Sequence, residues 1–272
     1  MTDRYAVFGN PLSQTKSPQI HTAFAAQFGD DLTYEAIEAP VDGFEGAVRQ
    51  FLSEGGKGLN VTLPFKVAAS ALADERREAA EICGASNCLK LEAGRLVAEN
   101  FDGVGLVRDI EANMGLRLRG KRVLFAGAGG ATRGAVAPFL DAGCAEIVIA
   151  NRTVSKAEEI AGLMAGHGAV AASSYEALTG RFDIVLNSTS TGLSGTGLPI
   201  PDAVFSGARL AYELAYGKGK TPFLKAAEEG GAAEIADGVG MLVEQAAEAF
   251  LWWRGHRPDT APVIDALRVP LI

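Results

Sequence analysis

KRVLFAGAGGATRG (residues 121–134) runs from an apolar stretch through a glycine-rich turn into a helix start. This order is the one that a dinucleotide-binding fingerprint, G-x-G-x-x-G, requires. Gly127 allows a tight turn, and Gly129 lets the backbone approach a pyrophosphate at the positive end of the following helix. Because Thr132 stands where the third glycine belongs, the pattern is incomplete. A plain glycine turn of an α/β protein therefore stays open as an alternative.

The next apolar run, EIVIANR (146–152), decides which dinucleotide is expected. An NAD site usually has an acid at this strand end for the ribose hydroxyls. Here the strand ends in Asn151-Arg152-Thr153, with Ser155 and Lys156 close behind. A guanidinium among hydroxyls suits a 2′-phosphate, because arginine forms paired hydrogen bonds to phosphate oxygens. Although a solvated arginine is the plainer interpretation, its coincidence with the glycine turn predicts NADP as the cofactor.

Strand and helix signals alternate through most of the chain, which predicts an α/β fold with parallel sheets in two lobes and a ligand cleft between them. Ser17 before Pro18 is typical of a helix N-cap, and Asp42 with Glu45 resembles a capping box for a helix through Leu52. Apolar runs predict strands at 4–9, 32–39, 58–63, 182–190 and 209–216, a hairpin at 86–100, and helices at 20–28, 102–115, 153–166 and 240–255.

Composition excludes several classes of protein. The chain has 272 residues, 48% of them hydrophobic and 21% charged, with a net charge of -8. Such a field repels nucleic acid, and no apolar run approaches the ~20 residues that span a bilayer. With no visible signal peptide, we expect a cytoplasmic enzyme. Cys83, Cys88 and Cys144 fit neither a disulfide framework nor a zinc site, so no metal is expected.

Polar residues follow several strands of the first lobe. Lys66 comes just after the strand of NVTLPFK (60–66), Asn87 lies in GASNC, and Asp102 stands where the first lobe leads into the second. Reduction of a ketone needs a proton donor at the carbonyl oxygen, and a lysine near a carboxylate can serve. Each residue alone is also typical of an exposed loop, so the hypothesis depends on their joint appearance.

The order of the motifs resembles that of shikimate dehydrogenases. The matching stretches are GNP, TKSP, NVTLPFK, GASN, NFDG, GAGGATRG, NRT, YGKGKTPF and DGVGMLVEQ, which together cover essentially the whole chain. The resemblance implies an N-terminal α/β substrate lobe (1–102, completed by C-terminal helices at 239–272) and a Rossmann-like NADP-binding lobe (103–238). It implies reversible NADPH-dependent reduction of 3-dehydroshikimate to shikimate, an oxidoreductase step of chorismate and aromatic amino-acid biosynthesis.

The same resemblance assigns roles to residues. Lys66 is expected as the acid/base, with Asp102 as its partner and a ligand of a substrate hydroxyl. The residues expected to hold the substrate are Thr15, Ser17, Thr62, Asn87, Asp102, Tyr216 and Gln245. Those expected around the cofactor are Gly127, Ala128, Gly129, Gly130, Ala131, Asn151, Arg152, Thr153, Val154, Ser155 and Lys156, with Leu214 and Gly238 near the nicotinamide.

Two departures from the family pattern affect the choice of substrate. The family's usual SKSP is TKSP here, which adds a methyl group at Thr15, and its common NTDG is NFDG, which places Phe101 beside Asp102. Phe101 can instead point into the core. A quinate/shikimate dehydrogenase of broader substrate or NAD use, and a non-catalytic NADP-binding sensor, remain as alternatives. The sequence leaves monomer and homodimer equally open.

Overall fold

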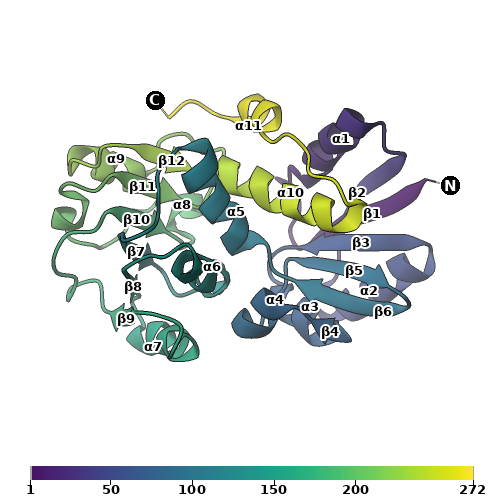
Figure 1. The fold of residues 1–272 in the computed structure, drawn as a ribbon, viewed down its shortest axis with the longest axis horizontal. Coiled ribbons are helices and arrows are strands. Elements are labelled where there is room, and N and C mark those ends of the chain that lie inside the picture. Colours follow the sequence, from purple (N-terminus) through teal and green to yellow (C-terminus); the bar gives the residue numbers. More distant parts are fainter. Residues whose placement is uncertain (1, 272) are drawn as a thin grey trace. The chain divides into compact units, whose positions relative to one another are not determined.

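A computed structural model describes residues 2–271, apart from the side chains at positions 192 and 193. The chain forms two compact units, each with its own six-stranded sheet (Figure 1). The first unit contains the residues up to Gly105 and the later segment Val243–Val263. The second unit contains Leu106–Leu242 and the residues from Ile264 onward. The first unit is therefore discontinuous in sequence.

The first unit has a mixed sheet in the order β2-β1-β3-β5-β6-β4. Its parallel part joins β2 (Leu32–Glu38), β1 (Asp3–Gly9) and β3 (Gly56–Val61), and the antiparallel hairpin β5 (Cys88–Glu92) and β6 (Arg95–Glu99) extends it to β4 (Glu75–Arg76). Its helices are α1 (Ser17–Phe28), α2 (Phe44–Ser53), α3 (Lys66–Leu72) and α4 (Glu78–Cys83), with a 3-10 turn at Val41–Gly43.

Alternation along β1 gives this sheet a buried face on each side, since successive side chains of a strand point to opposite faces. Ala6 and Phe8 pack in a core with Phe44 and Phe51 of α2. Tyr5 and Val7 pack in a second cluster, against which Trp253 of α10 (Val239–Arg254) lies. The Tyr5 and Trp253 rings stack at 4.7 Å. The late segment of the chain thus completes the core of the first unit.

The second unit has an all-parallel sheet in the order β12-β11-β10-β7-β8-β9. Its four central strands are short apolar runs that are buried on both faces, as parallel sheets require, and its two edge strands are only partly buried. They are β7 (Arg122–Ala126), β8 (Glu146–Ala150), β9 (Val170–Ser173), β10 (Ile184–Asn187), β11 (Leu210–Glu213) and β12 (Ile235–Asp237). The helices of the unit include α6 (Gly130–Asp141), α7 (Val154–Leu163), α8 (Thr191–Ser194) and α9 (Pro222–Glu229), with a 3-10 turn at Asp202–Phe205.

Three helices contain a position at which the chain passes from one unit to the other, namely α5 (Asp102–Arg108), α10 and α11 (Ala261–Leu267). No helix among residues 2–271 is both long and apolar enough to cross a membrane.

The α/β fold with two lobes and a Rossmann-like parallel sheet is confirmed, but three local predictions are wrong. Lys16, rather than Ser17, is the N-cap of α1, and Ser17 is already helical. Asp42 and Glu45 form no capping box, because the chain after Pro40 first makes a 3-10 turn and α2 begins only at Phe44. The expected helix at 102–115 is regular only to Arg108 and continues as a π-helical turn, Asp109–Asn113.

Candidate active site

Lys66 and Asp102 form a close ion pair in the first unit, with 2.5 Å between Lys66 Nζ and Asp102 Oδ2. The side chains are 19% and 7% exposed, so the pair is largely shielded from water. Each residue begins a helix, Lys66 at α3 and Asp102 at α5. The N-terminus of a helix is its positive end, so an acidic side chain is stabilised there and a cationic side chain is destabilised. The Asp102 carboxylate therefore offsets the unfavourable placement of the lysine.

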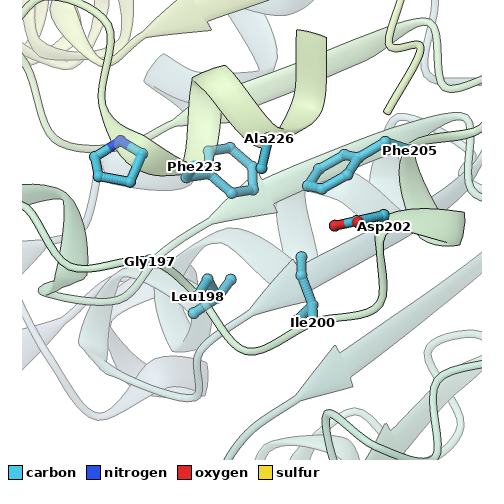
Figure 2. Close-up of a pocket in the computed structure, with 8 residues that line it drawn as sticks. Gly197, Leu198, Ile200, Asp202, Phe205, Phe223 and Ala226 are labelled. Atoms are coloured by element: carbon cyan, nitrogen blue, oxygen red, sulfur yellow. The ribbon is translucent and has the colours of Figure 1, made fainter. Parts of the chain in front are cut away.

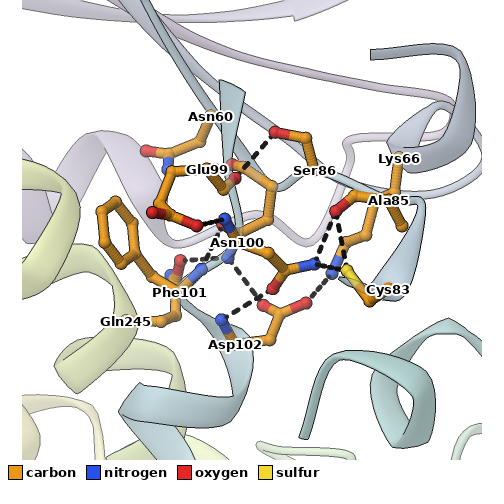
Figure 3. Close-up of polar contacts among 11 residues, drawn as sticks. Asn60, Lys66, Cys83, Ala85, Ser86, Glu99, Asn100, Phe101, Asp102 and Gln245 are labelled. Carbon is orange, nitrogen blue, oxygen red and sulfur yellow. Dashed lines mark hydrogen bonds and ion pairs between the residues drawn. The ribbon is translucent and has the colours of Figure 1, made fainter. Parts of the chain in front are cut away.

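Asn87 organises the groups around this pair, and Figure 3 labels its partners Phe101, Asp102 and Gln245. Its Nδ2 donates to Asp102 Oδ1 at 2.7 Å and to Gln245 Oε1 at 3.1 Å, while its Oδ1 accepts from the Phe101 backbone N–H at 2.8 Å. All three contacts fix the orientation of the amide. The structure thus brings four of the predicted site residues, Lys66, Asn87, Asp102 and Gln245, into one hydrogen-bonded cluster.

Asn100 belongs to the same cluster, although the sequence did not single it out. Its Oδ1 accepts from the Asp102 backbone N–H at 3.1 Å, and its Nδ2 donates to the Ala85 carbonyl at 3.0 Å. Asn100 is buried and lies directly after β6. A polar residue at the end of a buried strand is the signal that could have found it. Its side chain fixes the start of α5, and with it the position of Asp102.

Thr15 and Ser17 lie together at the start of α1. The Ser17 N–H donates to Thr15 Oγ1 at 3.4 Å, and Thr15 Oγ1 donates to Ser17 Oγ at 3.3 Å. Thr62 follows β3, and its methyl group lies 2.5 Å from where a Cβ on Gly9 would stand. Only glycine therefore fits at position 9, because any side chain there would displace Thr62. Among the described residues, no hydrogen bond joins Thr15, Ser17 or Thr62 to the Lys66–Asp102 pair.

Three further buried side chains, Asn60, Tyr34 and His21, extend from the cluster into the interior of the first unit. Asn60 donates from Nδ2 to the Asn87 carbonyl at 3.2 Å and accepts from the Tyr34 hydroxyl at 2.7 Å. The His21 ring stacks on Tyr34 with 4.2 Å between ring centroids. Burial lowers the pKa of His21 to about 3 and raises the pKa of Tyr34 well above its usual value. Both side chains are therefore neutral at neutral pH and serve as packing for the site.

Phe101 is half-buried, and its ring meets the Trp252 ring edge to face at 5.8 Å. Trp252 is itself covered by the Arg77 guanidinium, 4.8 Å from the ring centroid. Although Phe101 is next to Asp102 in sequence, its side chain packs on an aromatic partner from α10. Its backbone N–H supports Asn87, as described above.

In the second unit, the glycine turn lies between β7 and α6. Gly127 has a φ of +116°, and a Cβ there would stand 2.8 Å from Ser188 Oγ, so glycine is required. Gly129 and Gly130 have nothing within 4 Å of a built Cβ. Thr132, which breaks the generic pattern, is buried and donates to the Gly127 carbonyl at 2.8 Å. Its hydroxyl therefore holds the turn closed.

The tip of β8 lies next to this turn, since the Gly127 N–H donates to the Ala150 carbonyl at 2.7 Å. Asn151 closes the tip by donating from Nδ2 to the Thr153 carbonyl at 2.8 Å. Arg152, Thr153, Ser155 and Lys156 are exposed, and Val154 is half-buried as the first residue of α7. The structure thus places the two predicted cofactor loops side by side at the carboxyl ends of neighbouring parallel strands.

Leu214 and Gly238 also meet, although 24 positions separate them in the sequence (238 minus 214). A Cβ on Gly238 would stand 2.1 Å from the Leu214 carbonyl oxygen, so the contact depends on glycine. Tyr216 lies two residues further along the same segment and is partly buried, which raises its pKa.

A small pocket of about 60 Å³ lies elsewhere in the second unit (Figure 2). Leu198, Ile200, Phe205 and Phe223 give it apolar walls, and Asp202 is its only charged lining residue. None of the predicted site residues lines it. It holds little more than a couple of water molecules, so it is no cofactor or substrate site.

Three family models match the chain. Residues 7–89 match the shikimate dehydrogenase substrate binding domain, residues 109–194 match shikimate / quinate 5-dehydrogenase, and residues 238–268 match the shikimate 5′-dehydrogenase C-terminal domain. The first and last matches fall largely in the discontinuous first unit, and the middle one falls in the second unit.

Similar proteins extend over the full chain. The NADP(+) shikimate dehydrogenase of Alkalilimnicola ehrlichii is 53% identical over 98% of this chain and 99% of its own length. A crystal structure of an Ael1 enzyme from Pseudomonas putida is 57% identical, with a TM-score of 0.96 over 100% of both chains. Shikimate 5-dehydrogenase from Thermus thermophilus, solved in complex with NADP(H) and shikimate, is 31% identical, with a TM-score of 0.86 over 98% of both chains. On this identity and coverage, the chain belongs to the shikimate dehydrogenase family.

Proposed function

We propose that this protein catalyses the reversible, NADPH-dependent reduction of 3-dehydroshikimate to shikimate. The observation that carries the proposal is the shielded Lys66–Asp102 pair at the starts of two helices, in a chain of this family. A proton donor held by a carboxylate beside fixed amide groups is what reduction of a ketone to an alcohol requires.

Lys66 is the proposed proton donor. As negative charge builds on the substrate oxygen, the ammonium gives up one proton to it, and in the reverse direction the amine takes that proton back. Asp102 Oδ2 holds Nζ at 2.5 Å and so fixes its direction. Asn87 and Asn100 hold Asp102 in turn through its Oδ1 and its backbone N–H. Such fixed geometry lowers the entropic part of the barrier.

The substrate carboxylate is proposed to bind at the start of α1. The free N–H groups and the dipole of a helix N-terminus attract anions, and the hydroxyls of Thr15 and Ser17 lie there. Thr62, Asn87, Asp102, Tyr216 and Gln245 complete the proposed set of substrate ligands. The Asn87–Gln245 hydrogen bond of 3.1 Å supports a shared role for these two amides.

The residues of the second unit fit NADP. The open surface at Gly129 and Gly130 admits a pyrophosphate close to the backbone, at the start of the 12-residue helix α6. Arg152 is exposed beside Thr153 and Ser155, where a 2′-phosphate can be paired. When bound, the reduced cofactor supplies the hydride. Leu214 and Gly238 are proposed to lie near the nicotinamide, and the required glycine keeps their contact close.

We further propose a cytoplasmic enzyme. Cys83, Cys88 and Cys144 are free thiols, which are typical of a reducing compartment. The alternatives are a quinate/shikimate dehydrogenase of broader substrate or NAD use and a non-catalytic NADP-binding sensor. Arg152, in place of an acid, disfavours the use of NAD by the first of these. The Lys66–Asp102 pair disfavours the second, because binding alone needs no proton donor.

One experiment separates these functions. Absorbance of NADPH and of NADH is followed with 3-dehydroshikimate and with 3-dehydroquinate. We expect fast oxidation of NADPH with 3-dehydroshikimate and much slower reaction in the other three combinations. Preference for NADH or for 3-dehydroquinate would support the quinate enzyme, and binding of NADPH without turnover of either substrate would support the sensor.

A further inference from the structure

Two carboxylates lie at the ends of neighbouring strands in the second unit. Glu213 ends β11 and Asp237 ends β12, and the two residues are partners in the parallel register. Glu213 is fully buried and Asp237 is half-buried. Burial raises the pKa of each carboxyl group. Neither residue belongs to the proposed proton-transfer or cofactor machinery, so their retention in the interior needs another reason.

Both carboxylates bind the backbone on either side of Tyr216. The Ala215 N–H donates to Glu213 Oε1 at 3.3 Å, and the Gly217 N–H donates to Asp237 Oδ2 at 3.2 Å. These amides immediately precede and follow Tyr216 in the chain. A side chain between two anchored peptide groups has little freedom to change its direction.

The other oxygen of each carboxylate binds the elements that flank this segment. Glu213 Oε2 accepts from Asn187 Nδ2 at 2.8 Å and from the Thr221 hydroxyl at 3.2 Å. Thr221 is also the N-cap of α9, where its hydroxyl accepts from the Leu224 N–H. Asp237 Oδ1 accepts from the Val239 N–H at 3.3 Å, at the start of α10. The segment from Leu214 to Thr221 is therefore anchored at both ends.

No ion pair of Glu213 or Asp237 occurs within the described part of the chain. Asp237 lies near enough to Glu213 to disfavour its charge, and Arg268 partly offsets the charge of Asp237. Burying a carboxylate on neutral partners costs free energy relative to water. Hydrogen bonds to a charged acceptor are also about twice as strong as neutral ones, so the arrangement fixes its donors firmly. The two buried carboxylates are therefore better explained by the positioning of their donors than by a gain in the stability of the fold.

We propose that Glu213 and Asp237 are positioning residues that fix residues 214–217 and thereby aim the Tyr216 side chain and the Leu214 carbonyl group at their ligands. Among residues 2–271, the Tyr216 hydroxyl has no hydrogen-bond partner, which leaves it available to the substrate. The role of Tyr216 as a substrate ligand rests on the proposed function, whereas its anchoring does not.

Glu213→Gln is the primary test, because it keeps the size of the side chain and replaces one acceptor oxygen by a donor. Whichever way the amide turns, its NH2 group faces either the Ala215 N–H or the two donors on Asn187 and Thr221. Glu229→Gln, on the exposed last turn of α9, is the matched control for loss of one negative charge. Asp237→Asn carries the same test if Glu213→Gln does not fold.

Amide hydrogen exchange of the free protein gives the first readout. We expect exchange of the 215–217 amides to be about tenfold faster in Glu213→Gln, since one hydrogen bond to a charged group is lost. Amides of β7 and β8, and all amides of Glu229→Gln, should exchange as in the unmodified protein. Unchanged exchange at 215–217 would overturn the proposal.

A double-mutant cycle with Tyr216→Phe gives the second readout. Glu213→Gln should lower kcat/KM for 3-dehydroshikimate by roughly tenfold alone but less than about threefold in the Tyr216→Phe background, because interacting residues are not additive. Equal losses in both backgrounds would mean a general structural role and refute the proposal. If the unmodified protein does not turn over 3-dehydroshikimate, the proposed function fails, and the exchange measurement alone decides the positioning role.

Discussion

Asp102 is bound at three points in the first unit. Its two carboxylate oxygens and its backbone N–H are each bound by a different residue, namely Lys66, Asn87 and Asn100. Removing one partner of a shielded ion pair leaves a charge without compensation. Substitutions within the cluster therefore change both chemistry and stability, and the two effects have to be separated by the choice of variant.

Lys66→Ala tests the proton donor. We expect kcat to fall by about 10²–10⁴-fold, the usual contribution of general acid–base catalysis, with little change in KM. Asp102→Ala should impair both kcat and KM, because it removes a substrate ligand and the partner that orients the lysine. Steady-state kinetics with Lys57→Ala, an exposed lysine of the same unit, provides the control. Near-full kcat in Lys66→Ala would assign proton donation to water or to Asp102.

Arg152→Glu tests the choice of cofactor. A carboxylate at the tip of β8 would face the 2′-phosphate, so we expect KM for NADPH to rise at least about tenfold, as the loss of charge-assisted bonds implies. Activity with NADH should change much less. Arg117→Glu, at another exposed position of the second unit, controls for the change in net charge. Equal kcat/KM for the two cofactors in the unmodified protein would contradict the assignment of Arg152.

At the scale of the element, the start of α1 is the proposed site of the substrate carboxylate. Ser17→Ala removes one hydroxyl donor, so we expect KM for 3-dehydroshikimate to rise by roughly tenfold and kcat to change little. Thr22→Ala, on an exposed position of the same helix, should leave both constants unchanged. An unaltered KM in Ser17→Ala means that the carboxylate binds at another element.

Elements with a strong periodic or apolar signal could be predicted from the sequence. The strands β1, β7, β8, β10 and β11 are short apolar runs. Such runs are expected where a strand is covered on both faces of its sheet. The N-terminal caps could not be predicted, because Pro18 fits at either of the first two helical positions and the chain after Pro40 makes a 3-10 turn before α2 begins. Three-residue β12 carries too little pattern to distinguish it from a loop.

The site itself was only partly accessible from sequence. Lys66 and Asn87 stand out in the sequence because they are polar residues that border apolar runs. The contact of Asn87 with Gln245 joins positions 158 residues apart, which no local pattern encodes, so resemblance to a family had to supply it. Glu213 escaped notice because a single acid at the end of LAYE looks like any exposed strand end, whereas it is fully buried.

At the scale of the whole molecule, His21 makes stability depend on pH. Its folded-state pKa is about 3 against 6.5 in the unfolded chain. The folded state therefore binds fewer protons between these values, so stability is fully present above pH 6.5 and is lost as pH falls toward 3. His21→Phe keeps the stacked ring on Tyr34, and the buried Nε2 that it removes has no partner among the described residues.

As the pH falls from about 6 to 4, we expect the unmodified protein to lose about 1.4 kcal/mol of unfolding free energy per pH unit relative to His21→Phe. Urea unfolding at a series of pH values measures the difference, since all other titrating groups are common to both proteins. His167→Phe, at an exposed histidine, should run parallel to the unmodified protein. Parallel curves for His21→Phe as well would show that the imidazole is not kept neutral by burial.

The discontinuity of the first unit has a consequence for synthesis. Chains leave the ribosome N-terminus first, and domains generally fold as units. The strands β1 to β6 emerge early, yet Phe250 and Trp253, whose rings cover His21 and Tyr5, emerge only after the whole of Leu106–Leu242. The nascent sheet therefore carries an uncovered aromatic face while the second unit is translated. That face is the kind of transient surface that chaperones recognise, so the unit that begins folding first can complete its core only late in translation.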